Sequence, residues 1–471
     1  MATTTTPQKS VKKIPKIPDS SRFFGNIPEM NKDVVGFFHR CQQEHNEIFE
    51  VTFIRDFKGV FVFNSDMIKH VLVKNNRNYV KSLEYKTLKR VLGNGILVSE
   101  GDFWRKQRRL AQPAFHRQRL ANLNNLMVDC TQTLLEDLAE TPANKAFDLH
   151  EKMMQLTMDI VSRALFSFEK GAEGETIAKV IEAGNHYINY QIRFPFPFTK
   201  YLPVPTNLKW WRLRGSLAKV MMDVIRDRQM GKVTDKDDLM QMLVEVQDED
   251  TGKKMSTQQL FDEALTIFVA GHETTAVALS WVWYLLGKNP DKAAKLYEEV
   301  DRVLGNRTPT MEDLRQLTYT RWVIDETMRL YPPAWIMGRQ PLEEDNICGY
   351  PVPKENMVKI FVYGIHRDPR FYTNPDAFEP ERFAPEIAKQ RPKYAYLPFG
   401  GGPRLCIGNN FALMEMQIVL AMMAQRFRFR LAKPDETIGL EPLVTLRPKG
   451  GVAVFVEKRR GTNSISKATS K

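Results

Sequence analysis

The chain has 471 residues, 43% of them hydrophobic, and a formal net charge of +12. That length is enough for one large domain or two ordinary ones, each able to bury a substantial core. The four cysteines indicate a reducing compartment, where disulfides are rare. The positive charge suits an anionic membrane, an acidic protein or nucleic acid. Because the sequence contains no nucleic-acid-binding motif, we expect no nucleic-acid partner.

Composition divides the chain into three parts. Residues 1–20 are rich in Thr, Lys and Pro and contain neither a signal-peptide core nor the ~20-residue apolar run of a membrane anchor. We therefore expect a flexible segment and a soluble, cytoplasmic protein. Residues 21–458 contain no repeat and no Gly/Ser linker, which predicts a single domain. Residues 459–471 are rich in Ser and Lys, and we expect a disordered tail.

Helical patterns dominate the predicted secondary structure. Residues 48–64 alternate between apolar and polar positions, which predicts a β-hairpin that ends where a helix can begin. Helical periodicity follows at 118–139, 149–168, 175–190, 214–229, 257–287, 290–304, 311–330 and 409–426, and strand-like runs occur at 337–341, 357–361 and 441–456. The sequence therefore predicts a mainly α fold with a small β-sheet region.

The longest predicted helix, 257–287, carries polar residues in its middle. Ser256, with Gln259 three residues later, forms a capping box that starts this helix. Residues 271–275 (Gly-His-Glu-Thr-Thr) interrupt an apolar pattern, and buried polar groups cost free energy unless they are paired. A threonine hydroxyl bonded back to the carbonyl four residues earlier would bend the helix here. The result would be a local opening with room for a diatomic ligand and water.

Cys406 lies in the glycine-rich loop 399–408 (Phe-Gly-Gly-Gly-Pro-Arg-Leu-Cys-Ile-Gly), shortly before the apolar stretch 411–423. The other three cysteines are far from it in sequence, so the paired spacings of a four-sulfur metal cage are absent. A lone thiolate serves either as a nucleophile, which needs a histidine base, or as the axial ligand of a haem. Cys406 alone leaves both alternatives open.

The neighbours of Cys406 favour the haem ligand. Glycines at positions 400–402 and 408 remove side chains that would keep backbone N–H groups away from the sulfur. Phe399 can cover the sulfur. Arg404, two residues before it, can form a charge-assisted pair with the carboxylates on the edge of a haem.

The loop fits the pattern F-x-x-G-x-R-x-C-x-G through Phe399, Gly402, Arg404, Cys406 and Gly408, and so resembles the haem-binding loop of the cytochrome P450 family. Further segments that resemble marks of this family occur in the expected order: Trp104-x-x-x-Arg108, Ala270 to Thr275, Glu326-x-x-Arg329 and Pro380-Glu381-Arg382-Phe383. The resemblance implies the cytochrome P450 fold, a triangular prism with haem b between two central helices. It also implies that the Cys406 thiolate is the axial ligand of the haem iron.

The resemblance assigns roles to individual residues. Thr274 would stabilise the activated oxygen, and Glu273 would carry protons toward it as a general acid. Glu326, Arg329 and Arg382 would form a buried, structural ion-pair network under the haem loop. The carboxylates of the haem would be held by Trp104, Arg108, Arg339 and Arg404, with Lys81 assisting.

Residues 194–203 are aromatic and proline-rich and interrupt the helical pattern, as expected of a mobile lid over a pocket or of packed surface. The resemblance places the substrate pocket next to them. Because the implied lining is apolar, we expect a hydrophobic substrate such as a fatty acid, a terpenoid or a carotenoid. The implied lining residues are Phe268, Ala270, Ala334, Met337, Leu443 and Val444.

These features predict an oxygen-dependent haem-thiolate monooxygenase. About 65 residues follow Cys406, too few for a flavin reductase, so NAD(P)H-derived electrons are expected through a separate ferredoxin-type or flavodoxin-type partner. The basic run 105–109 would face such an acidic carrier, or would be an ordinary solvated helix face. The alternatives are a peroxide-driven or isomerase-type enzyme of the same fold, and a haem sensor without turnover.

Overall fold

The structure is a computed structural model that describes residues 12–54, 57–116, 120–167, 172–193, 198–233, 238–248 and 251–459. The predicted tail lies outside the described residues except for Arg459, which forms an ion pair with Asp301 at 2.6 Å. Part of the predicted lid, 194–197, also lies outside them.

Residues 1–11 of the predicted flexible segment 1–20 lie outside the described residues, but residues 15–17 are held by backbone hydrogen bonds. The Ile17 N–H donates to the Glu50 carbonyl at 2.9 Å, and the Glu50 N–H donates to the Pro15 carbonyl at 2.8 Å. The side chain of Ile17 is buried. Composition did not reveal this, because the segment is ordered by pairing with a strand 33 positions further along the chain.

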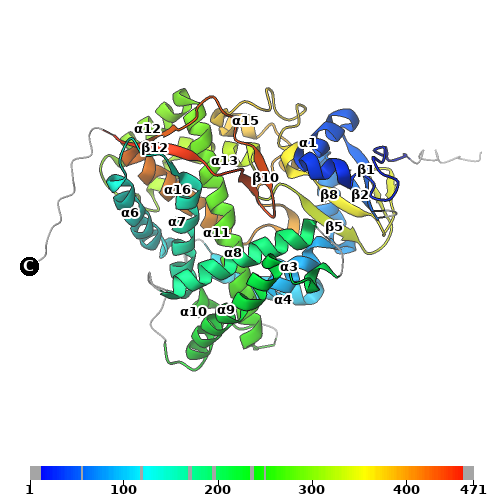
Figure 1. Cartoon of the computed structure of the whole chain (residues 1–471), viewed down its shortest axis with the longest axis horizontal. Helices are drawn as coiled ribbons and strands as arrows, with labels where there is room; N and C mark the ends of the chain where they lie inside the picture. Colours follow the sequence, from blue (N-terminus) through cyan, green and yellow to red (C-terminus); the bar gives the residue numbers. More distant parts are fainter. Residues whose placement is uncertain are drawn as a thin grey trace, which may run out of the picture.

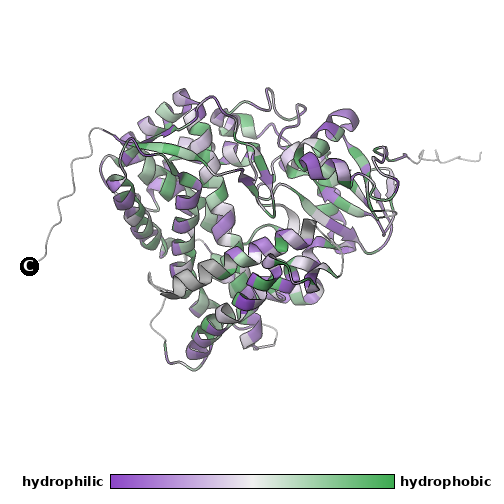
Figure 2. Ribbon diagram, viewed as in Figure 1, coloured by the Kyte–Doolittle hydropathy of each residue, from purple (hydrophilic) through white to green (hydrophobic). Residues whose placement is uncertain are grey.

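Helices make up most of the molecule and surround the long helix α11. The main sheet and α1 lie together at one end of the molecule, away from α6 and α12 (Figure 1). The outer helices alternate hydrophilic and hydrophobic residues (Figure 2), as helices with one solvated face do. The helices are α1 (Ile27–His45), α2 (Ser65–Lys69), α3 (Glu84–Leu92), α4 (Gly101–Ala111), α6 (Asn124–Glu140), α7 (Leu149–Phe166), α8 (Ala172–Arg193), α9 (Pro205–Gln229), α10 (Leu239–Glu245), α11 (Thr257–Lys288), α12 (Pro290–Leu304), α13 (Thr318–Leu330), α14 (Val362–Ile365), α15 (Pro385–Ala388) and α16 (Asn409–Arg426).

The strands form one five-stranded sheet and three smaller ones. The main sheet has the order β1-β2-β8-β5-β3, in which β2 and β8 are parallel and the other neighbours antiparallel. The main sheet contains β1 (Ile48–Ile54), β2 (Phe57–Val62), β3 (Tyr79–Lys81), β5 (Met337–Pro341) and β8 (Met357–Ile360). The smaller sheets contain β4 (Phe147–Asp148), β9 (Phe427–Leu431) and β12 (Ala453–Lys458), the pair β6 (Asp345–Ile347) and β7 (Tyr350–Val352), and the pair β10 (Leu440–Pro442) and β11 (Leu446–Pro448).

The observed elements confirm the predicted mainly α fold with a small β-sheet region. The predicted hairpin corresponds to β1 and β2, the predicted helix 290–304 has the bounds of α12, and the predicted strand 337–341 has those of β5. The side chain of Ser256 caps α11 by accepting a hydrogen bond from the Gln259 N–H at 3.2 Å. The helices α1 and α3 and the strands β6, β7 and β9 were not predicted. The alternation of Phe427, Phe429 and Leu431 in β9 is a strand signal that could have been found.

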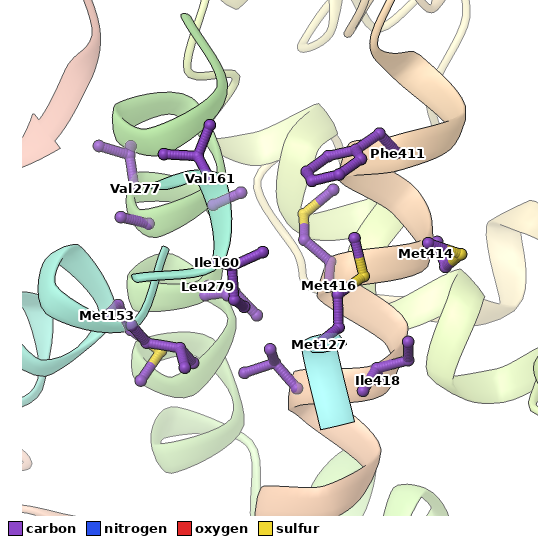
Figure 3. Close-up of a cluster of buried hydrophobic side chains, with 14 of the residues drawn as sticks. Met127, Met153, Ile160, Val161, Val277, Leu279, Phe411, Met414, Met416 and Ile418 are labelled. Carbon is purple, nitrogen blue, oxygen red and sulfur yellow. The ribbon is translucent and has the colours of Figure 1, made fainter. Parts of the chain in front are cut away.

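Helix α11 is the centre of the core. It packs along α7 and also contacts α13 and α16, and side chains of α7, α11 and α16 converge with Met127 of α6 in one apolar cluster (Figure 3). By length and hydropathy α11 could cross a membrane, but 78% of its most apolar window is buried inside the molecule. It is therefore a core helix of this fold.

One carboxyl group lies inside this core without a hydrogen-bond partner. Glu415 is the one charged residue in the apolar stretch 411–423, and neither of its side-chain oxygens is hydrogen-bonded within the described residues. Burial raises the pKa of Glu415 well above its ordinary range, although the nearby Thr275 hydroxyl lowers it. A carboxyl group in this setting is held in its neutral form.

We expect a pH-dependent effect of Glu415→Gln on stability. Because the pKa is raised in the folded state, Glu415 contributes stability that is fully present below the pKa of an exposed glutamate, about 4.3, and that is lost as pH rises toward the folded pKa. The Gln variant should therefore gain stability relative to the parent by up to about 1.4 kcal/mol per pH unit in that window. Denaturant unfolding at several pH values measures this difference.

Glu299→Gln is the matched control. Glu299 is also buried, but its oxygens accept hydrogen bonds from the Tyr319 and Thr320 N–H groups at 2.6 and 2.7 Å and from two threonine hydroxyls. Removing that charge weakens charge-assisted bonds, so this variant should be destabilised at neutral pH. A Glu415→Gln variant that is destabilised in the same way would contradict the assignment of Glu415 as an unpaired acid.

Candidate active site

The loop that carries Cys406 is shaped by two glycines with positive φ, Gly400 (75°) and Gly402 (65°). At Gly402 a Cβ atom would lie 2.0 Å from the Leu72 carbonyl oxygen, so a larger residue fits neither the backbone conformation nor the space. The Cys406 N–H closes the loop by donating to the Phe399 carbonyl at 3.0 Å. The loop then leads through Gly408 into α16.

Cys406 is an exposed residue, although burial of its thiol is the main reason that the pKa of the thiol is raised. These two facts agree only if the thiol faces an internal space. The Gly408 N–H and the Arg108 guanidinium act in the opposite direction and lower the pKa of the thiol. A backbone donor, a cation and the following helix N-terminus all favour a thiolate once a metal ion binds it.

Helix α11 presents a face of small residues to the interior. Ala270 is exposed and Gly271 and Thr274 are partly exposed, although most of the surrounding helix is buried. The Thr274 hydroxyl donates to the Ala270 carbonyl at 2.7 Å, which confirms the predicted bond to the carbonyl four residues earlier. Helix α16, which follows the Cys406 loop, packs against α11.

Three basic side chains gather at one edge of this site. Lys81 of β3 and Arg339 of β5 are direct cross-strand neighbours, so their side chains lie on the same face of the sheet. Burial, followed by the charges of Arg339 and Arg404, lowers the pKa of Lys81. Arg404 donates to the Ser99 carbonyl at 2.8 Å and pairs with Glu100. Within the described residues neither Lys81 nor Arg339 forms an ion pair, so this edge has an excess of positive charge.

Helix α4 also contacts the Cys406 loop. The Arg404 guanidinium lies over the Trp104 ring at 3.8 Å from its centroid, and Arg108 donates to the Leu405 carbonyl at 2.7 Å. The structure therefore places both predicted haem-binding residues of α4 in contact with the cysteine loop. Trp104 supports Arg404, and Arg108 contributes charge close to the sulfur.

An open depression of about 870 Å³ lies outside this junction, between α4 and the Cys406 loop. It is lined by Trp104, Arg105, Arg108, Arg109, Gln112, Pro113, His116, Gly402, Pro403 and Leu405. The basic residues on its rim are partly neutralised, because Arg105 pairs with Asp102 and Arg109 pairs with Asp248 at 2.7 Å.

Glu273 is buried and held by three donors. Its carboxylate accepts hydrogen bonds from Asn185 of α8 at 2.8 Å and from the Thr445 hydroxyl, and it forms an ion pair with Arg447 of β11 at 2.7 Å. Its neighbour His272 is neutral, since burial lowers the pKa of the imidazole to about 4. Asn185, Thr445 and Arg447 were missed in the sequence, because they lie about 90 to 170 positions from Glu273 and no local pattern connects them.

Five of the six predicted pocket residues are exposed or partly exposed: Ala270, Ala334, Met337, Leu443 and Val444. Phe268 does not belong with them. It is 1% exposed and packs near Phe166 of α7, with 6.3 Å between the ring centroids. Two positions along an α-helix correspond to about 200° of rotation, so Phe268 lies on the side of α11 opposite Ala270 and faces the core, which does not support the prediction that it lines the pocket.

Glu326, Arg329 and Arg382 form one buried network. Arg329 is bidentate to Glu326 at 2.7 and 2.8 Å, and Arg382 lies 3.3 Å from the same carboxylate. Arg329 also donates to the backbone carbonyls of His366, Pro375 and Ala377. The ring of His366 accepts the Leu397 N–H at 2.8 Å, so the network is connected to the start of the Cys406 loop.

Comparison with known proteins identifies the family. The family model described as Cytochrome P450 matches residues 15–455. The chain belongs to the cytochrome P450 family. It is 38% identical over 371 residues to the cyclooctatin synthase of Streptomyces melanosporofaciens, covering 78% of this chain and 79% of the relative.

Further relatives of this cytochrome P450 come from bacteria and animals. Putative cytochrome P450 132 of Mycobacterium tuberculosis is 36% identical, with 85% of this chain and 88% of the relative covered. Human cytochrome P450 4V2 is 30% identical, with 96% and 91% covered. The relatives thus span nearly the whole described part of the chain.

The family implies a haem with a cysteine thiolate ligand, and the residues of this chain fit that group. Cys406 presents a sulfur to an internal space. At its edge, Lys81 and Arg339 are cross-strand neighbours that form no ion pair within the described residues, so both side chains can serve the two haem carboxylates.

We expect Gly402→Ala to abolish or strongly reduce haem binding. The added Cβ would collide with the Leu72 carbonyl oxygen and would also need a strained φ of 65°. Gly450→Ala is the control, because Gly450 has a φ of 79° but no atom within 4 Å of the added Cβ. Haem content per protein measures the effect, and equal haem content in the two variants would show that contact with Leu72 is unimportant.

Glu326→Ala or Arg329→Ala should destabilise the protein and release haem. Each change leaves an uncompensated charge in the interior, which costs about 3–5 kcal/mol. Arg321→Ala removes an ion pair of the same helix, Arg321–Asp325 at 2.8 Å, whose arginine is 39% exposed, and should cost under about 1 kcal/mol. A Glu326→Ala protein with normal haem absorption and unfolding midpoint would contradict this role.

Proposed function

We propose that this cytochrome P450 is an oxygen-dependent monooxygenase that inserts one oxygen atom into a hydrophobic substrate by hydroxylation or epoxidation. The observation that carries the proposal is that the chain combines a cysteine loop folded to hold a thiolate ligand with a helix, α11, in which the partly exposed Thr274 directly follows the acid Glu273. An acid and an alcohol at this position suit reduction of molecular oxygen, which consumes protons.

Bound haem, with its thiolate ligand, supplies the electron-rich iron at which oxygen is cleaved. The residues of the chain hold this group and manage protons. Cys406 provides the sulfur, and Lys81, Arg339 and Arg404 offer positive charge to the haem carboxylates. Because the Thr274 hydroxyl donates its proton to the Ala270 carbonyl, its oxygen lone pairs are free to accept a hydrogen bond from water in the interior.

In this proposal Glu273 carries protons from solvent to the interior of the protein. Its carboxylate is paired with Arg447 at 2.7 Å, so it must leave that ion pair, at least in part, before it takes up a proton. Arg447 is partly exposed and connects the pair to solvent. The neighbouring Thr445 hydroxyl offers a second donor while the carboxylate changes partners.

The lining favours a fatty acid, a terpenoid or a carotenoid as substrate. Ala270, Ala334, Met337, Leu443 and Val444 are accessible and contain no charged group, and an apolar pocket binds apolar molecules. One relative, 32% identical over 82% of this chain, is named cyclooctat-9-en-7-ol 5-monooxygenase. The name of this relative supports a lipophilic substrate.

The electrons would come from NAD(P)H through a separate ferredoxin-type or flavodoxin-type protein in the cytoplasm. The depression between α4 and the Cys406 loop is the supporting feature, because it is open, lies beside the sulfur-bearing loop and is bordered by Arg105, Arg108 and Arg109. An acidic carrier bound there would be close to Cys406 and electrostatically attracted.

The central experiment supplies the purified haem protein with a surrogate ferredoxin system, NADPH, oxygen and a panel of apolar compounds. Oxygen consumption with formation of an oxygenated product supports the proposal. Product formation from hydroperoxides alone would support the peroxide-driven or isomerase-type alternative. Substrate-induced haem spectral shifts without any turnover would support a sensor.

Thr274→Ala should leave haem binding intact but divert electrons to hydrogen peroxide, with a fall in product of about tenfold or more, since acid–base groups contribute about 10²–10⁴ in rate. Ser280→Ala is the control: its hydroxyl also bonds back four residues along α11, to the Ala276 carbonyl at 2.6 Å, but lies almost two helical turns further along the chain. Unchanged coupling in Thr274→Ala would contradict its role.

Cys406→His should abolish the absorption that a reduced thiolate-ligated haem shows with carbon monoxide, because imidazole donates less electron density to iron. Cys348→Ser, which changes an exposed cysteine in the turn between β6 and β7, should keep that absorption. A thiolate-type spectrum in the Cys406→His protein would exclude Cys406 as the iron ligand.

A further inference from the structure

Residues 93–98, between α3 and α4, pack directly against the first turns of α11, and we call them the 93–98 loop. The Asn94 N–H donates to the carboxylate of Asp262 at 2.7 Å, and the Ile96 N–H donates to that of Glu263 at 3.0 Å. Two neighbouring acids of one helix thus hold alternate backbone N–H groups of one loop. The loop is attached to α11 through its backbone.

Two glycines allow the loop to approach α11 this closely. A Cβ atom at Gly93, whose φ is 66°, would lie 2.1 Å from the Asp262 carboxylate. A Cβ atom at Gly95 would lie 2.1 Å from the Thr266 hydroxyl oxygen. Thr266 and Ala270 are one helical turn apart and so lie on the same face of α11. Because Ala270 is exposed on that face, the loop covers α11 directly beside the proposed substrate pocket.

The chain that follows the loop is attached to the Cys406 loop. The Ser99 carbonyl accepts a hydrogen bond from Arg404 at 2.8 Å, and Glu100 pairs with the same guanidinium. The position of the 93–98 loop is therefore coupled by direct contacts to α11 at one end and to the cysteine loop at the other.

The two acids that hold the loop have different surroundings. The second oxygen of Asp262 accepts a hydrogen bond from the Gln258 side chain at 2.8 Å. Glu263 is fully buried, and its second oxygen accepts no hydrogen bond within the described residues. Burial raises the pKa of Glu263 to about 7, the Ile96 N–H lowers it, and the charge of Asp262 raises it further. Glu263 is therefore placed to gain or lose its proton close to neutral pH.

The charged groups of the neighbouring elements do not offset this burial. The 93–98 loop contains no titratable residue, and Lys89 and Arg90 of α3 are exposed. Asp238, which precedes α10, pairs with Arg228 of α9 at 2.6 Å. Basic residues of α4 and α7 are also bonded to other groups: Lys106, Arg108 and Arg163. Ionisation of Glu263 thus places a second negative charge next to Asp262.

We propose that Glu263 is a positioning residue that keeps the 93–98 loop closed on α11 while its carboxyl group is neutral and releases the loop when that group ionises. A buried anion with a single donor is unstable unless water reaches it, and water reaches it when the loop moves away. The Thr266 hydroxyl and the Gln107 side-chain oxygen are also buried without a partner in the described structure, so this water has further groups to bind.

Release of the loop should ease the access of ligands to the haem, because the loop lies beside the pocket face of α11 and contacts the residues next to the cysteine loop. Access should therefore be faster above neutral pH than below it. The inference concerns any ligand of the haem, so it does not depend on the proposed oxygen-dependent reaction.

Linkage gives the size of the effect. The closed loop favours the neutral acid, so its advantage is complete below the pKa of a hydrated glutamate, about 4.3. That advantage is lost as pH rises through the pKa of Glu263 in the closed loop, about 7. The ratio of open to closed loop should therefore rise about tenfold from pH 6 to pH 8 and change little at higher pH.

Hydrogen–deuterium exchange of the haem-loaded full chain tests this inference. In the parent, the N–H groups of residues 94–98 should lose protection by about tenfold between pH 6 and pH 8, after correction for the pH dependence of intrinsic exchange. Glu263→Gln keeps an acceptor for the Ile96 N–H but cannot ionise, so its protection should be the same at both pH values. Asp262→Asn is the control, which should lower protection at both pH values and retain the pH dependence.

A second measurement follows access to the haem. The probe is n-butyl isocyanide, which carries no group that titrates in this range and binds to reduced haem. Its rate of binding should rise by up to about tenfold from pH 6 to pH 8 in the parent and stay constant in Glu263→Gln. Both variants should keep the haem absorption of the parent, which shows that they are folded.

Three results would overturn the proposal. The first is equal protection of the parent loop at pH 6 and pH 8, a result that needs no variant and so holds even if Glu263→Gln fails to fold. The second is a Glu263→Gln protein that follows the pH dependence of the parent. The third is isocyanide binding that is independent of pH in the parent although protection of the loop changes, because the loop would then not control access to the haem.

Discussion

The ion pair between Glu326 and Arg329 is the interaction on which the rest of the site depends. Both side chains are fully buried, so each is stable only because the other is present. Arg329 uses its remaining donors on three backbone carbonyls, and His366, one of those residues, holds the Leu397 N–H. Through these contacts one charged pair fixes the segment from His366 to Leu397, whose only α-helix is the short α15 and which leads into the Cys406 loop.

Much of this fold could be predicted from the sequence, because the signals are local. The cap of α11 needs only Ser256 and Gln259, and the shape of the cysteine loop needs glycines where φ is positive. The order of residues 15–17 was not predictable, since it comes from hydrogen bonds to Glu50. The face of α11 on which Phe268 lies was misjudged for a related reason: a helix with apolar residues on all sides gives no period from which a direction can be inferred.

Two buried glutamates, Glu415 and Glu273, differ in how much the sequence reveals about their surroundings. Glu415 could have been noticed, because it stands as the one charged residue in an apolar stretch. The environment of Glu273 could not, since its partners come from α8 and β11. Glu415 is therefore held neutral for lack of partners, whereas Glu273 is surrounded by three donors, although both are on core helices that contact each other. Burial alone does not determine the protonation of such a group; the donors around it do.

The contacts of Glu273 with the β10–β11 hairpin restrict which mutations the hairpin can accept. Leu443 and Val444 form the tip of that hairpin, and Thr445 and Arg447 follow directly and hold the carboxylate. A mutation that reshapes the tip for a different molecule also shifts the anchors of the acid. Under the proposed function, selectivity and proton supply therefore change together, and variants that accept new compounds would require compensating changes on α8 or α11 to keep their efficiency.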